Sequence, residues 1–242
     1  MKRSIISKYN NLSEKLTGYV AMMNYRFLNL CVKAEEVALL PCDVTIEGET
    51  LKFEEAAKAA KKNDYQFMVF PIYEEDLVAV GNSITEVHPE FKQEIEELSV
   101  ESYDEQGKPQ EQQVKYILIT MPDVDDNRYD ALNNAAKVIY EECKAQMEAA
   151  NSKSEADLAP LIVGESEEDI DKLKKAIDKL NNEKNELRDQ LYNEKKQEIK
   201  DAYKRWLSSY AKAEVENLEM EDSRGANVVT SMRMTNNNED SN

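Results

Sequence analysis

The sequence predicts an α+β protein in which a small mixed domain is inserted into a bundle of long helices. Apolar residues recur at helical spacing near the start of the chain and again over its second half, whereas a block between them alternates like β-strands. Charged residues make up 33% of the 242 residues, and there are only 6 Gly and 6 Pro. That composition suits long, solvent-flanked helices better than a sandwich or barrel.

The first long helix is predicted from Ile5 to about Leu39, because apolar side chains recur there every three or four residues. Pro41 cannot continue it, since proline lacks the backbone N–H and its ring clashes with the preceding turn. The most apolar stretch, 16–32, contains polar residues and is short for a bilayer, so we interpret it as a buried helix and expect no transmembrane span.

The middle block predicts a mixed β/α domain. Strands are expected at 42–46, 65–72 and 114–121, short helical segments at 76–84 and 90–98, and a polar loop at 101–113. Pro122 ends this block, after which the helical period returns.

Two more long helices are expected in the second half. The first begins at a cap provided by Asp123, Asp125 or Asp126 and runs to about Ala150. Its predicted inner stripe is Leu132, Ala136, Ile139, Cys143 and Met147. The last helix starts at a capping box in 166–169. Its apolar residues keep heptad spacing through Leu187 and Leu191, and after an offset Ile199, Tyr203, Trp206 and Tyr210 resume the stripe.

These elements define the expected domains. Residues 1–40 and 122–220 form the three-helix bundle, 41–121 form the inserted domain, and 221–242, which show no period, form a disordered tail. Pro41 and Pro122 would be the hinges of an L-shaped molecule.

Charge and chemistry narrow the class of function. A net charge of −18 disfavours bulk nucleic acid and anionic membranes, and favours basic proteins or a mixed ribonucleoprotein as partners. Three scattered cysteines and one histidine, His88, show no disulfide framework and no metal-ligand spacing. Because no nucleophile–base pair or phosphate-binding loop can be assembled either, we expect a non-enzymatic protein without a cofactor or metal.

Several local motifs, in order, resemble the ribosome recycling factor family. They are the strand and turn 39–48 followed by Phe53 and Ala57, the strand 67–74, the strand and proline 117–122 followed by 125–128, and the acidic helix start 165–169. The resemblance covers roughly residues 4 to 200. It implies a protein that docks between ribosomal subunits after termination and helps a translocating GTPase to separate them.

The departures from the family concern arginine. The family binds ribosomal RNA through arginines at the end of its first helix and along its second, where this chain has 30–33 (LCVK) and 141–148 (EECKAQME). The resemblance therefore leaves Lys33 and Arg128 as residual RNA contacts. Arginine bonds phosphate in two places at once, whereas lysine supplies a point charge, so the family's mode of RNA binding is weakened here.

Two functions remain open. One is a recycling factor in a mitochondrial or other organellar matrix, or alternatively in the cytoplasm. The other is a non-catalytic accessory subunit of a large organellar complex that has kept the fold. The first dozen residues carry Lys2, Arg3 and Lys8 without an acid, which fits either a transit peptide or a basic first helical turn.

An aromatic cluster is the remaining candidate site. Tyr203, Trp206 and Tyr210 share one helical face and form either a patch for a protein partner or a surface that packs on Tyr9 and Ile5.

Overall fold

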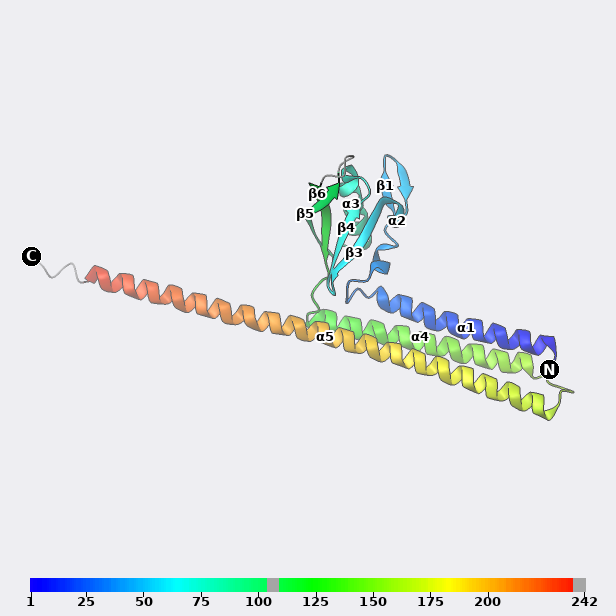
Figure 1. The fold of residues 1–242 in the computed structure, drawn as a ribbon. Helices are drawn as coiled ribbons and strands as arrows, with labels where there is room; N and C mark the ends of the chain where they lie inside the picture. Colours follow the sequence, from blue (N-terminus) through cyan, green and yellow to red (C-terminus); the bar gives the residue numbers. More distant parts are fainter. Residues whose placement is uncertain (104–108, 237–242) are drawn as a thin grey trace, which may run out of the picture.

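The computed structural model describes the backbone of residues 1–103 and 109–236, and the side chains of 1–101 and 109–212. Three long helices lie side by side, and a mixed domain stands at the end of the bundle where α1 ends and α4 begins (Figure 1). The chain leaves the bundle once, builds this domain and returns. The predicted α+β fold class is confirmed.

The bundle consists of α1 (Arg3–Leu28), α4 (Asp126–Leu158) and α5 (Glu167–Asn236). Asp125 caps α4, because its Oδ1 accepts a hydrogen bond from the amide of Arg128 at 2.8 Å. All five residues of the predicted inner stripe of α4 are buried, so that prediction is confirmed. They pack against one face of α1, formed by Leu12, Leu16, Val20, Met23 and Phe27.

The first helix ends earlier than predicted, at Leu28 rather than near Leu39. Cys31 has a φ of 51°, in the left-handed region that side-chain-bearing residues rarely adopt, and this turn stops the helix. The apolar residues that follow belong to the separate turn η1 (Glu36–Leu39) and to the core of the mixed domain. The sequence predicted a longer helix because the apolar residues after Leu28, which fill the core of the mixed domain, continue the same spacing.

The mixed domain begins with a small hairpin of β1 (Val44–Ile46) and β2 (Glu49–Leu51), followed by the single turn α2 (Phe53–Ala56). Within the described residues, an antiparallel sheet then has the order β3-β4-β6-β5. Its strands are β3 (Ala57–Asn63), β4 (Gln66–Pro71), β5 (Lys92–Tyr103) and β6 (Pro109–Thr120). Between β4 and β5 lie the turn η2 (Glu74–Asp76) and the helix α3 (Leu77–Val87). Val80 and Ile84 of α3 share a core with Phe67, Val69, Ile117 and Ile119 of the sheet.

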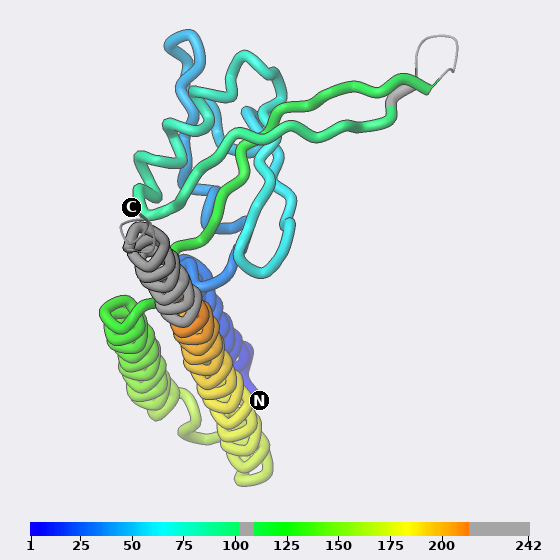
Figure 2. The backbone as a smooth tube through the Cα atoms, turned by 90° about the vertical axis from the view of Figure 1, so that its left-hand side faces the viewer, coloured from blue at the N-terminus to red at the C-terminus, as the bar shows by residue number. Residues whose placement is uncertain are grey.

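Two predictions for this domain were wrong. Residues 90–98 are not helical, because β5 pairs with β6 along its whole length. The predicted polar loop 101–113 is largely the outer part of the same hairpin, with 104–108 outside the described residues. Figure 2 shows β5 and β6 leaving the sheet together as a two-stranded arm.

The last helix differs from its prediction at its end and in its inner stripe. It continues to Asn236, whereas the sequence predicts a disordered tail from 221; residues 237–242 lie outside the described part. Leu187, predicted in the stripe, is 40% exposed, and the neighbouring Arg188 is 7% exposed. Among the described helices, none is both long and apolar enough to cross a bilayer.

Candidate functional site

The chain crosses between its two domains at two places. At the first crossing, Phe27 packs in the bundle core and Cys31 in the core of the mixed domain. At the second, Met121 belongs to the mixed domain and Val124 to the bundle. Pro122 therefore lies in the second crossing.

Pro41 lies elsewhere than the sequence suggests. Its neighbours Leu39 and Cys42 are both fully buried in the core of the mixed domain. The first crossing therefore precedes Pro41, and residues assigned to the bundle by the predicted boundary belong to the inserted domain.

A turn between β3 and β4 joins both crossings, a role that the sequence did not indicate. The amide of Ala34 donates to the carbonyl of Asp64 at 2.8 Å, and the amide of Met121 donates to the carbonyl of Tyr65 at 2.9 Å. The ring of Tyr65 packs against both cores, and the guanidinium carbon of Arg205 lies 3.0 Å from its centroid. Asp64 and Tyr65 thus connect the mixed domain to α5 as well as to the two crossings.

Arg128, predicted to contact RNA, is held inside the junction. Its Nη2 donates to the carbonyl of Cys31 at 3.1 Å, so it links the first turn of α4 to the first crossing. Burial lowers the pKa of Arg128 from its ordinary value, and among the described residues its Nε is buried without a hydrogen-bond partner. The guanidinium of Arg128 therefore bonds within the junction rather than pointing into solvent.

Lys33, the other predicted RNA contact, lies at the surface of the same junction. Its Nζ is 4.0 Å from Oδ2 of Asp64, and its side chain is 35% exposed. Lys61 binds the same carboxylate at 3.0 Å. The hydrogen bond and charge of Lys61, together with the charge of Lys33, hold the pKa of Asp64 below its usual value. Lys33 can release this long contact at little cost, because exposed ion pairs contribute only about 0–1 kcal/mol.

Two other arginines along the bundle, Arg26 and Arg188, are also engaged within the chain. Arg26 pairs with Glu142, and Arg188 bonds Asp189 at 2.7 Å and lies over the ring of Tyr140 at 5.1 Å. Arginine is the residue best suited to bidentate phosphate binding, and these side chains are committed to contacts between helices.

The aromatic residues of α5 divide into an inner and an outer part. Tyr203 stacks on Tyr129 of α4 at 4.4 Å, and its hydroxyl donates to Asp126 at 2.5 Å. Trp206 contacts Tyr203 and Tyr210 along its own helix, and Tyr210 is 54% exposed. The predicted alternative, packing on Tyr9 and Ile5, is wrong, because those residues pack near Leu158 and Leu173.

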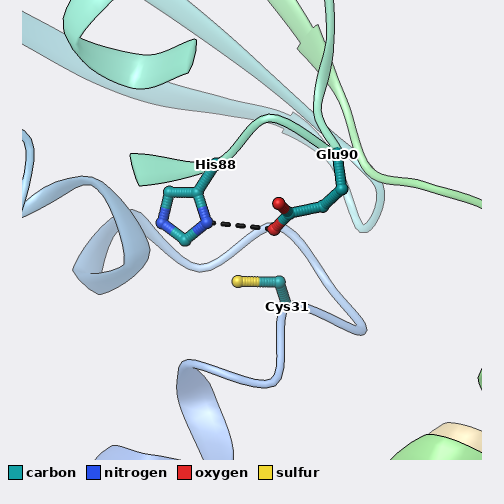
Figure 3. Close-up of side chains that lie close together, drawn as sticks. All are labelled: Cys31, His88 and Glu90. Carbon is teal, nitrogen blue, oxygen red and sulfur yellow. Dashed lines mark hydrogen bonds and ion pairs between the residues drawn. The ribbon is translucent and has the colours of Figure 1, made fainter. Parts of the chain in front are cut away.

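The structure also assembles a group of metal-binding residue types, Cys31, His88 and Glu90, at the first crossing (Figure 3). The sequence indicated no such site. Cys31 and His88 lie far apart in the chain, and only the fold brings them together.

Comparison with solved structures identifies the architecture. A structure described as the solution structure of the ribosome recycling factor aligns with 83% of this chain and 100% of its own, at 14% identity and a TM-score of 0.60. The chain has the fold of ribosome recycling factor. No protein-family model and no curated protein matches its sequence.

A second structure extends this comparison. It describes models of the Thermus thermophilus ribosome recycling factor and the Escherichia coli elongation factor G bound to the E. coli post-termination complex. It aligns with 81% of this chain and 98% of its own, at 17% identity and a TM-score of 0.50. Because each alignment covers nearly all of the other chain, the recycling-factor fold here includes both the bundle and the inserted domain.

Within the recycling-factor fold, the structure brings together Lys33, Pro122 and Arg128, which the sequence singled out separately and did not place at one junction. The sequence resemblance did not indicate Asp64 or Tyr65, although the Asn63-Asp64 pair ahead of an aromatic residue is a common turn signal. The aromatic cluster on α5 borders the junction through Tyr129 and Arg205.

Proposed function

We propose that this chain is a recycling-factor-like protein that binds the post-termination ribosome and assists separation of the subunits together with a translocating GTPase. The observation that carries the proposal is the alignment of nearly the whole recycling-factor chain with this one. In this role the protein supplies shape and contacts, and it carries out no bond chemistry.

The junction supports this proposal because only a few connections join the two domains. Two crossings, one turn and few polar bonds connect the mixed domain to the bundle. A change in the angle between the domains would need to break the Arg128–Cys31 bond and the Arg205–Tyr65 contact, while both cores stay intact. Pro122 would act as a hinge in such a motion. Lys33 would then be the more available RNA contact, and Arg128 would become available only after the junction opens.

A second candidate function is a non-catalytic accessory subunit of a large organellar assembly. The observation that favours it is the internal engagement of Arg26, Arg128 and Arg188, in a chain with a net charge of −18. On this proposal the outer part of the aromatic cluster, the half-buried Trp206 and the exposed Tyr210, is the partner surface. Exposed aromatic residues are enriched at protein interfaces.

The location proposed for either function is an organellar matrix, and it rests on the basic residues at the start of the chain. The contacts of these residues fit a basic first helical turn equally well, because Lys8 pairs with Asp157 at 2.7 Å and Lys2 with Glu165 at 3.5 Å. Fluorescence imaging of a copy tagged at its C-terminus tests the proposal, and diffuse cytoplasmic signal would contradict it.

The test of function is sedimentation of a tagged copy from gently lysed cells on a density gradient. Under the recycling-factor proposal the protein co-migrates with ribosomes or subunits, and Lys33→Ala with Arg128→Ala weakens that co-migration. Lys137→Ala is the matched control, because Lys137 is an exposed lysine on α4. Stable co-migration with another large complex, lost in Trp206→Ala, would instead support the accessory-subunit proposal.

A further inference from the structure

Three potential metal ligands converge where α1 leaves the bundle. Cys31 Sγ, a ring nitrogen of His88 and a carboxylate oxygen of Glu90 all lie within 4.8 Å of one another. Cys31 comes from the first crossing, and the other two come from the turn between α3 and β5 (Figure 3). The cluster therefore joins two chain segments that are distant in sequence.

The hydrogen bonds of His88 leave a bridging atom to be supplied between its ring and Glu90. Its Nε2 lies 2.8 Å from the carbonyl oxygen of Ala38, which can only accept, so Nε2 carries a hydrogen. Its Nδ1 lies 3.0 Å from Oε1 of Glu90, which in its ionised form is also an acceptor. Two lone pairs facing each other at this distance need a bridge between them, either a hydrogen carried by one of the two groups or a metal ion.

We propose that Cys31, His88 and Glu90 form a binding site for a divalent transition-metal ion, with Zn²⁺ as the preferred ion. Sulfur, imidazole nitrogen and carboxylate oxygen are the three ligand types that zinc takes in proteins. Histidine that binds a metal usually donates its other ring N–H to a carboxylate or a backbone carbonyl. The bond from Nε2 to Ala38 already provides that arrangement and directs Nδ1 toward Glu90 and Cys31.

The spacing is close to what zinc needs. Bond lengths of about 2.0–2.3 Å in a tetrahedral site place neighbouring ligand atoms about 3.3–3.8 Å apart. The His88–Glu90 contact at 3.0 Å would open slightly, and the longest spacing in the cluster, at most 4.8 Å, would close by roughly 1 Å. Since the side chain of Glu90 is 39% exposed, the ion can reach the site and a water molecule can complete the coordination.

The charged groups around the cluster have opposite effects on the pKa of the Cys31 thiol. The Cys31 thiol must release its proton to solvent when its sulfur binds zinc, and burial together with the charge of Glu90 raises its pKa to about 11. The charges of Arg128 and Lys195 act in the opposite direction on the thiol, but as cations they also repel a metal ion. Zinc binding should therefore be strongly pH-dependent and weaken as the pH falls.

Such an ion would affect the junction. It would connect the first crossing, through Cys31, to the α3–β5 turn, through His88 and Glu90, beside the Arg128 bond to the Cys31 carbonyl. Metal binding would thereby stiffen the connection that the proposed function requires to move. The site itself does not depend on that function.

Titration of the metal-free full chain with Co²⁺, followed by absorbance, tests the site. We expect one equivalent to produce thiolate-to-cobalt charge-transfer absorbance that stoichiometric Zn²⁺ abolishes. Cys31→Ser should remove this absorbance, and Glu90→Gln should weaken binding at least about tenfold, as loss of supporting groups around zinc does. Cys143→Ser is the matched control, because Cys143 is a buried thiol in the bundle core.

A stability measurement keeps the proposal testable if Cys31→Ser disturbs folding. Zn²⁺ should raise the Tm of the full chain in a concentration-dependent manner, because an ion that binds only the folded state stabilises it. Glu90→Gln changes an exposed residue and should lose that shift while keeping the Tm of the metal-free protein. No charge-transfer absorbance in the wild-type chain, or a signal that persists in Cys31→Ser, would overturn the proposal and leave His88 and Glu90 as a hydrogen-bonded pair.

Discussion

At the scale of single residues, Arg128 links the first turn of α4 to the first crossing between the domains. The side chain donates to the backbone carbonyl of Cys31 at the first crossing and is half-buried. Hydrogen bonds to charged groups contribute about 1.5–3 kcal/mol. Arg128→Ala should therefore lower the free energy of unfolding by about 1–3 kcal/mol in urea denaturation.

Lys137→Ala is the control for this prediction and should stay within about 0.5 kcal/mol of the wild type, as most exposed substitutions do. Arg128→Lys should fall between the two, since lysine keeps the charge but cannot reproduce the fork of the guanidinium. If Arg128→Ala were as stable as the control, the bond to Cys31 would not contribute to the junction.

The cysteines give a second prediction at this scale. Cys31, Cys42 and Cys143 are all free and buried, and burial raises the pKa of Cys31 and of Cys42 to about 11. Only the thiolate reacts with disulfide reagents, and two pKa units lower its fraction about 100-fold below that of an ordinary thiol. In metal-free buffer at pH 8 the native chain should therefore react slowly with a chromogenic disulfide, and faster as the pH rises toward 11.

Denaturation provides the control for thiol reactivity. In guanidinium chloride all three thiols should react rapidly, because unfolding restores both exposure and an ordinary pKa. One rapidly reacting thiol in the native chain would show that the corresponding cysteine is accessible and that its pKa is not raised.

At the scale of elements, the sequence predicted the helices better than the strands. The stripe of α4 and the strand β4 follow from local periodicity. In contrast, β3 has the sequence AKAAKKN, which favours a helix, and β5 contains Ile95 and Leu98 at helical spacing. Both are strands because β4 and β6 pair with them, and such pairing overrides local propensity. Tertiary contacts also explain why the sequence predicted only part of the candidate site. Asp64 and Tyr65 acquire their role only from such contacts.

The inner face of α5 has a different repeat from the predicted heptad. Residues facing the bundle follow the series Leu173, Ile177, Leu180, Lys184, Arg188, Leu191, Lys195, Ile199 and Ala202. This is an 11-residue repeat, which keeps a helix nearly straight or gives it a slight right-handed supercoil. Two of its charged members have polar partners, since Arg188 bonds Asp189 at 2.7 Å and Lys195 bonds Glu198 at 2.8 Å.

The two repeats make opposite predictions for a pair of leucines. Leu180 is 6% exposed and Leu187 is 40% exposed, although a heptad would place both in the core. Leu180→Ala should lower the free energy of unfolding by about 2–5 kcal/mol. Leu187→Ala should cost less than about 1 kcal/mol, since little buried surface is lost. If urea denaturation showed equal losses of unfolding free energy for the two variants, the heptad rather than the 11-residue repeat would describe the inner face of α5.

The arm formed by β5 and β6 should be dispensable for folding. Beyond the Leu98–Val114 pair, none of the described side chains of the arm is buried, and β4 pairs with β6 only from Ile117 to Thr120. Replacing 99–113 by Asn-Gly should give a tight two-residue hairpin and change the Tm by no more than a few degrees. A non-cooperative or strongly destabilised thermal transition would mean that the arm helps to hold the sheet.

At the scale of the whole molecule, charge separates the two proposed functions. With 49 acidic and 31 basic side chains, the chain can approach a ribosome only where local contacts outweigh general repulsion from phosphate. Because Arg26 and Arg188 are engaged within the bundle, the cations that the proposed function would present to RNA at the junction are Lys33 and, once its bond to Cys31 breaks, Arg128. Any affinity must then come mainly from shape and from contacts with ribosomal proteins.

This balance predicts an unusually weak dependence of ribosome binding on salt. Each neutralised phosphate contributes a slope of about −0.9 to the plot of log K against log salt, so two contacts predict a slope of about −1.8. Binding of purified ribosomes to the labelled chain, measured by co-sedimentation between low and moderate salt, gives this slope directly. Lys33→Ala should reduce its magnitude by about one unit while leaving the fold unchanged, because its contact with Asp64 is long and exposed. A slope near −5 would reveal a basic surface other than the junction, and complete lack of binding would leave the accessory-subunit proposal as the function of this recycling-factor fold.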